Sequence, residues 1–140
     1  MAEAIARHWV RQGVVEGGED LLVASAGVYA GEGMAMTSES AVALDRLGVD
    51  TAGNGGSTPL SAAMVDAAEV VLCMTSAHES AVRDMLGEAA TVVQCLDPDG
   101  DLPDPIGQGQ PVYDALAEHL MELIPRRLKD VLGQPQGKPA

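Results

Sequence analysis

Two Asp-Pro pairs and two cysteines are the residues of this chain that could do chemistry. Asp97-Pro98 and Asp104-Pro105 lie in a stretch rich in Asp, Pro and Gly, from 97 to 109, which predicts a loop. A carboxyl group there can donate a proton to a leaving group, or it can form a turn, since Asp-Pro-x-Gly is a turn sequence. Cys73 and Cys95 lie in apolar, strand-like runs. This favours reduced core residues over a disulfide or redox pair.

The elements that must position these residues alternate between helix and strand. Apolar spacing and capping residues predict helices that begin near residues 2, 38, 62, 76 and 111. Short apolar runs predict strands over 21–25, 70–74 and 91–95. This order is typical of an α/β fold, a three-layer sandwich with a short parallel sheet flanked by helices. We expect one domain over 1–133 and a disordered tail over 134–140.

Length and charge limit the classes of function. A chain of 140 residues suits a single core, and its net charge of -13 argues against nucleic acid or an anionic membrane as a partner. Residues 1–20 lack a signal-peptide pattern, and no apolar run approaches the length of a membrane span. We therefore expect a cytoplasmic protein; the sequence leaves the oligomeric state open.

The first predicted helix, over 2–12, begins without a cap. No Ser, Thr, Asp or Asn precedes Ala2 to accept hydrogen bonds from the free N–H groups, and no strand leads into the helix. In parallel α/β proteins, a helix N-terminus that follows a strand is where phosphate binds. The part of the fold that carries chemistry is therefore expected just before residue 1.

Several short motifs occur in the order and spacing of one family. They are Met1 to Arg7, Ser25-Ala26-Gly27, Ser57-Thr58-Pro59-Leu60, Met74-Thr75 with His78, and Asp104-Pro105 with Gly107 and Tyr113. In these motifs the chain resembles the low-molecular-weight protein tyrosine phosphatases from residue 1 to about 125. The sequence around Ser25 and Met74 is most similar to that of the bacterial protein-arginine-phosphatase branch. The resemblance implies phosphorylated protein substrates, a cysteinyl-phosphate intermediate and no cofactor or metal.

The resemblance also implies a strand and a Cys-x5-Arg-Ser-Pro phosphate loop ahead of Met1. Neither Cys73 nor Cys95 has Arg at the sixth position after it, so the 140 residues contain no nucleophile of this kind. We expect the chain as given to be inactive, through a misassigned start or as a fragment of a phosphatase. The alternatives are a non-catalytic, phosphatase-like interaction module or remnant, and less favourably an arsenate reductase relative. The DNA upstream of Met1 would separate these cases.

The missing strand would be central in this family. Its loss would leave two apolar strand edges unpaired, and each unmade backbone hydrogen bond costs about 1 kcal/mol. A small domain has only roughly 5–15 kcal/mol of stability. Unless the strands at 21–25 and 70–74 pair directly, we expect this chain alone to fold poorly. A cooperative thermal melt of the monomer would contradict that expectation.

The resemblance carries four residues over as site residues. Asp104 matches the family's general acid, because it stands shortly before a Gly and nine residues before Tyr113; Asp97 does not fit and is expected as a turn residue. Ser25 would contact the phosphate loop from the neighbouring strand. Tyr29 would form a substrate wall or cover the core edge. Ile106 replaces a common aromatic at the mouth of the site.

An aliphatic residue at that mouth would stack poorly on a phosphotyrosine ring, so Ile106 favours a substrate such as phosphoarginine. The remaining candidates are expected to be structural or on the surface: His78 in the first turn of its helix, Tyr113 as a structural residue, and His8 and His119 on helix surfaces.

Overall fold

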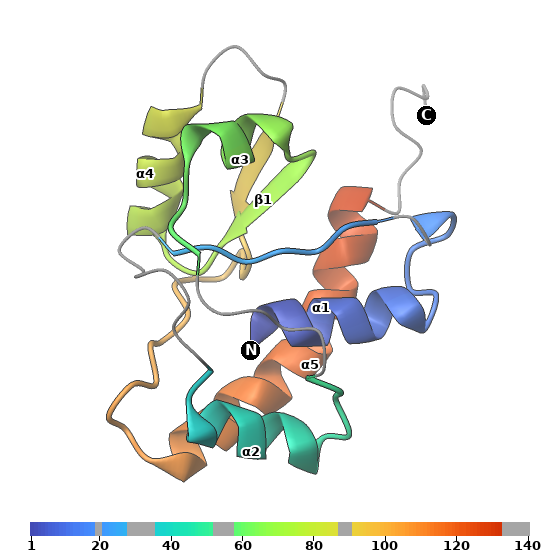
Figure 1. Ribbon diagram of the computed structural model, residues 1–140, viewed down its shortest axis with the longest axis vertical. Helices are drawn as coiled ribbons and strands as arrows, with labels where there is room; N and C mark the ends of the chain where they lie inside the picture. The colour runs from blue at the N-terminus through green and yellow to red at the C-terminus, as the bar shows by residue number, and fades with distance from the viewer. Residues whose placement is uncertain (19–20, 28–35, 52–57, 87–90, 133–140) are drawn as a thin grey trace. The chain divides into compact units, whose positions relative to one another are not determined.

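The computed structural model describes residues 1–18, 21–27, 36–51, 58–86 and 91–132 (Figure 1). Its Cα positions divide the chain into two compact units, which we describe separately. The first consists of Met1–Ala24, Met36–Asn54 and Pro105–Ala140, and the second of Ser25–Ala35 and Gly55–Asp104. The single domain over 1–133 stays a prediction, and the tail over 134–140 lies outside the described residues.

Three helices build the first unit: α1 (Ala2–Arg11), α2 (Ser38–Arg46) and α5 (Gln110–Leu132). The long helix α5 packs against both α1 and α2. Its apolar side chains at helical spacing form one buried stripe: Leu116, Leu120, Leu123, Ile124 and Leu128. Next to this stripe, Tyr113 and Ala117 form a cluster with Ala43 of α2. Tyr113 is only 2% exposed, which confirms its structural role.

The second unit is a small βαβ arrangement. Strands β1 (Val70–Cys73) and β2 (Val92–Cys95) pair in parallel, and α4 (Ser76–Met85) connects them. The short helix α3 (Ala62–Ala67) precedes β1. Val65 of α3, Val82 of α4, and Cys73 and Val93 of the strands form one buried cluster. One face of the two-stranded sheet is therefore covered by both helices.

Side-chain caps stand where the sequence predicts the helices to begin. Thr37, Ser61 and Thr75 occupy the N-caps of α2, α3 and α4. Each side chain accepts a hydrogen bond from the backbone N–H three residues later, that is, from Ser40, Met64 and His78. Helix α1 has Met1 at its N-cap and no side-chain cap, as predicted. The α/β class, with a short parallel sheet and helices, is confirmed.

The predicted strand over 21–25 is wrong. Residues 21–26 adopt no strand, and Leu22 is 98% exposed. Strand-like pairing begins only at Gly27, which forms an isolated parallel bridge to Pro59. In this bridge, Gly27 N–H donates to Thr58 O (2.9 Å), and Gly27 O accepts from Leu60 N (3.0 Å). An apolar run becomes a strand only where a neighbour completes its hydrogen bonds. In the described sheet, residues 21–25 do not pair with residues 70–74.

Candidate active site

The carboxyl ends of β1 and β2 form the edge of the sheet from which the candidate acid loop starts. Because the strands are parallel, both end at this edge, where α/β proteins bind ligands. Leu96 N–H donates to Cys73 O (2.7 Å), and Leu102 N–H donates to Met74 O (2.9 Å). The loop thus leaves the end of β2 and returns to the end of β1 just before Asp104.

Asp104 lies on the surface, two residues after Leu102, which is only 5% exposed. A turn follows it: Gln108 N–H donates to Pro105 O (2.9 Å), and Gly107 at the third position has φ +77°, as a type II turn requires. The Asp-Pro-x-Gly sequence therefore does form a turn, but the turn starts at Pro105. Asp104 itself stands ahead of the turn and is exposed.

Asp97, the other candidate, is a turn residue as predicted. Its Oδ1 accepts from Asp99 N (2.9 Å) and its backbone O accepts from Gly100 N (3.4 Å). This local use of the carboxylate is the Asx turn that Asp favours. The two Asp-Pro pairs of the loop are thus structurally different.

The other three predicted site residues fall in different places. Ser25 is exposed and belongs to the same unit as Asp104, two residues before the Gly27 bridge. Ile106 belongs to the other unit and is 69% exposed at the second position of the Pro105–Gln108 turn. Tyr29 lies outside the described residues.

Cys73 and Cys95 lie side by side in the register of the sheet, close to α4. Burial, with smaller contributions from Cys95 and Glu79, raises the pKa of Cys73 to about 11. The pKa of Cys95 is also raised, by burial and by the nearby carboxylates of Glu79 and Asp101; its thiol lies 4.0 Å from Glu79 Oε1. Both are therefore protonated thiols at neutral pH and poor nucleophiles.

Helix α1 offers an anion-binding end. Its N-cap is Met1, whose backbone O accepts from Ile5 N (3.2 Å). The first N–H groups of the helix have no side-chain cap. Such a terminus carries a partial positive charge that favours an anion. Further along α1, Arg7 pairs with Glu3 (2.9 Å) and donates to Val23 O (3.0 Å), which holds residue 23 beside this helix.

A family model described as low molecular weight phosphotyrosine protein phosphatase matches residues 1–135. The chain belongs to this family. A protein-arginine-phosphatase of Geobacillus stearothermophilus is 35% identical over 109 residues, covering 74% of this chain and 72% of that protein.

Solved structures agree. An arginine phosphatase of G. stearothermophilus matches with a TM-score of 0.74 and 29% identity, covering 91% of this chain and 82% of that one. A low molecular weight protein tyrosine phosphatase from T. tengcongensis matches with a TM-score of 0.78 and 28% identity, covering 92% and 87%. The chain is therefore a low-molecular-weight phosphatase family member similar to bacterial arginine phosphatases.

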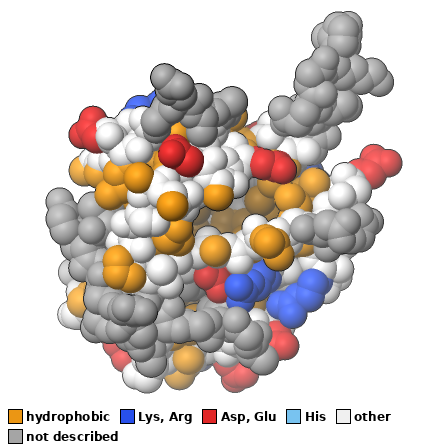
Figure 2. Space-filling model, turned by 45° about the horizontal axis from the view of Figure 1, so that its top comes forward, with side chains coloured by type: hydrophobic (Ala, Val, Ile, Leu, Met, Phe, Trp, Pro, Cys, Tyr) orange, Lys and Arg blue, Asp and Glu red, His pale blue; other side chains and the backbone are white. Residues whose placement is uncertain are grey.

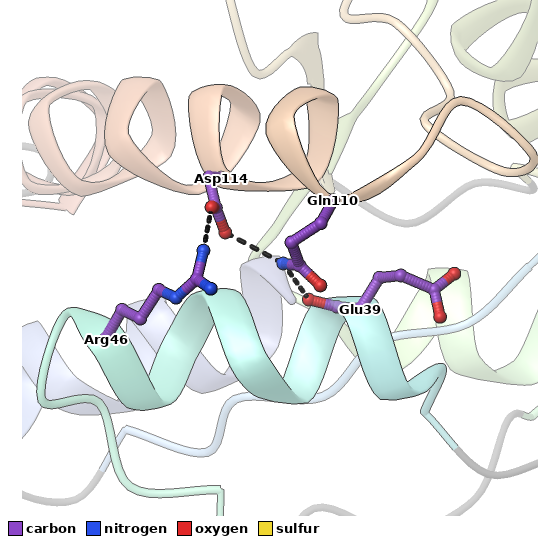
Figure 3. A network of polar contacts seen from close by, with 4 residues as sticks. All are labelled: Glu39, Arg46, Gln110 and Asp114. Atoms are coloured by element: carbon purple, nitrogen blue, oxygen red, sulfur yellow. Dashed lines mark hydrogen bonds and ion pairs between the residues drawn. The ribbon is translucent and has the colours of Figure 1, made fainter.

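Two features of this family member were missed from the sequence. Asp101 accepts from Ser76 N (2.8 Å) at the start of α4. The two residues are 25 positions apart in the sequence, so no local sequence pattern predicts this contact. Gln110, the first residue of α5, donates to Glu39 O of α2 (2.9 Å) and to Asp114 Oδ1 (2.8 Å), and Asp114 also pairs with Arg46 (Figure 3). Only the four-residue spacing of Gln110 and Asp114 is visible in the sequence.

The network in Figure 3 fixes where α5 begins, because it joins the first two turns of α5 to α2. Gln110 comes two residues after Gln108, which ends the turn that carries Ile106. The four polar residues therefore hold the end of the candidate acid loop that leads into α5. All four belong to the first unit, whereas Asp104 belongs to the second.

Within the part of the chain that the structure describes, no three His, Cys, Asp or Glu residues are grouped so as to hold a metal ion. In the same residues, no helix is both long and apolar enough to cross a membrane.

The protonated thiol of Cys73 should make the stability of this family member fall at high pH. The folded protein keeps this proton up to about pH 11, whereas the unfolded chain releases it near 9. The stabilisation is complete below pH 9 and is lost between pH 9 and 11, at about 1 kcal/mol per pH unit. Urea unfolding from pH 8 to 10 should show a steeper decline for the wild type than for Cys73→Ala. Equal slopes would contradict this origin.

Proposed function

We propose that this protein belongs to a phosphatase that hydrolyses phosphorylated residues of proteins through a cysteinyl-phosphate, with Asp104 as the general acid. The observation that carries the proposal is the position of Asp104 in a loop at the carboxyl edge of the sheet, exposed and ahead of the Pro105–Gln108 turn. The family match over residues 1–135 supports the reaction class. Ser25 and Tyr29 are proposed to line or support the same site.

The chemistry divides between two parts. A thiolate from the family's Cys-x5-Arg loop attacks phosphorus, and the bond to the leaving oxygen or nitrogen breaks as Asp104 gives that atom its proton. Asp104 then takes a proton from the water that attacks the cysteinyl-phosphate. The Arg and the backbone N–H groups of that loop stabilise the phosphoryl oxygens.

Of these parts, the 140 residues supply Asp104 but no Cys-x5-Arg sequence. Cys73 and Cys95 are unsuited as substitutes, because burial raises their pKa values and both lie in strands. This also disfavours arsenate reduction, which would need additional reactive cysteines. A second candidate is a non-catalytic module that binds phosphorylated or other partners.

We propose phosphoarginine as the preferred substrate. Ile106 is 69% exposed at the corner of its turn and offers an aliphatic surface instead of an aromatic one. An aromatic residue would stack on a phosphotyrosine ring, worth about 0.5–1.5 kcal/mol, and Ile106 cannot do so in the same way. The net charge of -13, with acidic side chains spread over the face in Figure 2, gives no general attraction for phosphate. Affinity must therefore come from local donors.

The test uses two chains. One is the 140-residue chain, and the other, the extended chain, has the strand and Cys-x5-Arg loop of the G. stearothermophilus relative joined ahead of Met1. We expect no turnover of p-nitrophenyl phosphate or phosphoarginine protein by the first, turnover of both by the second, and a higher kcat/KM for phosphoarginine than for phosphotyrosine peptide. Ile106→Tyr should shift this ratio toward phosphotyrosine about threefold to tenfold, as one stacking contact predicts.

Three results would contradict the proposal. Turnover by the 140-residue chain that Asp104→Ala abolishes would show a nucleophile among these residues. A folded extended chain that binds phosphate without turnover would favour the interaction module. A ratio unchanged by Ile106→Tyr would remove the argument for phosphoarginine.

A further inference from the structure

The part of the loop that precedes Asp104 is held at both of its ends by backbone contacts. Leu96 N–H donates to Cys73 O (2.7 Å) and Leu102 N–H to Met74 O (2.9 Å), and both leucine side chains are buried, at 4% and 5% exposure. The residues between them, 98–101, are exposed. In this exposed part, the side chain of Asp101 forms a hydrogen bond with helix α4.

The Asp101 carboxylate binds the start of α4. Its Oδ1 accepts from Ser76 N (2.8 Å) and its Oδ2 accepts from Ser76 Oγ (3.4 Å). The neighbouring Thr75 Oγ1 accepts from His78 N (3.1 Å), so two of the first N–H groups of α4 have side-chain acceptors. The negative charge is well placed at the positive end of the helix dipole. Asp101 also lies near the end of β2, since its charge contributes to the raised pKa of Cys95.

Helix α4 gives this contact a rigid base. It packs against both strands and against α3, and Val82 in its centre is 2% exposed. Asp101 precedes Asp104 by three residues, and the buried Leu102 lies between them. A fixed Asp101 and a fixed Leu102 together limit where the backbone of Asp104 can lie.

We propose that Asp101 is a positioning residue for the general acid: its bond to the start of α4 holds the loop so that the Asp104 carboxyl meets the leaving group. This inference rests on the proposed function. Proton donation needs a hydrogen-bond distance to the leaving atom, and a displacement of about 1 Å can slow a reaction as much as 100-fold. Asp101 itself touches no reacting atom.

The extended chain allows a double-mutant test. Asp101→Ala should lower kcat for phenyl phosphate about 10- to 100-fold with KM changed less than twofold. The loss should be smaller for p-nitrophenyl phosphate, whose better leaving group needs less protonation. In the Asp104→Ala background, Asp101→Ala should cause no further loss, because the group it positions is gone. Asp101→Asn should recover part of the rate, since its amide oxygen can still accept from Ser76 N.

A matched control and a second measurement complete the test. Asp99→Ala, in the same exposed part of the loop, should keep the parent rate. Asp101→Ala should also speed hydrogen exchange of the Ser76 amide in the extended chain, a readout that needs no turnover.

The outcomes separate the two proposals. An equal loss from Asp101→Ala with and without Asp104, or unchanged exchange at Ser76, would overturn the role of Asp101 alone. An active extended chain that is indifferent to Asp104→Ala would overturn the proposed acid, and the role of Asp101 with it.

Discussion

Replacing Asp104 with alanine in the extended chain should lower kcat for phenyl phosphate about 100- to 10,000-fold, the range expected for a lost general acid. Without a proton, the leaving oxygen must depart as an anion. KM should change little, because the carboxyl assists the transition state more than it binds the ground state. Steady-state rates of the variant and the parent, measured under the same conditions, give the effect.

Asp97→Ala is the matched control for this prediction. Asp97 also precedes a proline in the same loop, but its carboxylate accepts from Asp99 N (2.9 Å) within a local turn. We expect its rate to stay within about twofold of the parent and its stability to fall by about 1 kcal/mol, as for one lost hydrogen bond. Equal loss of rate in both variants would show that the loop acts as a whole and that Asp104 has no special role.

Leu120→Ala should lower the free energy of unfolding by about 2–5 kcal/mol, the range for a fully buried leucine. Leu120 lies in the middle of α5 with 0% exposure, and α5 packs against both α1 and α2. Removing the side chain loses its burial and leaves a cavity in the first unit. Urea unfolding of the extended chain, followed by circular dichroism, measures the loss.

Leu22→Ala is the control for the core substitution. The same chemical change at a side chain that is 98% exposed should alter stability by less than about 0.5 kcal/mol. If Leu22→Ala were as destabilising as Leu120→Ala, the exposure of residue 22 would be wrong and the predicted strand over 21–25 would have to be reconsidered.

Local chemistry explains which elements could be predicted. Thr37, Ser61 and Thr75 cap the helices that follow them, and a cap involves residues only a few positions apart. The same holds for the stripe of α5, whose period alone shows which side is apolar. The predictions of strands β1 and β2 are correct because the two strands pair in parallel with each other.

The segment over 21–25 shows where local reasoning fails. Its composition, Leu21 to Ser25, is as apolar and strand-like as that of β2, yet Leu22 is exposed and pairing begins only at Gly27. Composition describes the side chains, whereas a strand also requires hydrogen bonds from a neighbour. That neighbour is a property of the whole sheet.

By itself, the sequence determined the α/β class and the family, since order and spacing are properties of the chain; the choice of Asp104 over Asp97 as the acid stays a prediction. Only the tertiary structure decided that Asp101 binds Ser76 and that Cys73 lies beside Cys95 with a raised pKa. Those contacts join residues more than 20 positions apart. Distant groups meet, lose solvent and change their chemistry only when the helices and strands pack.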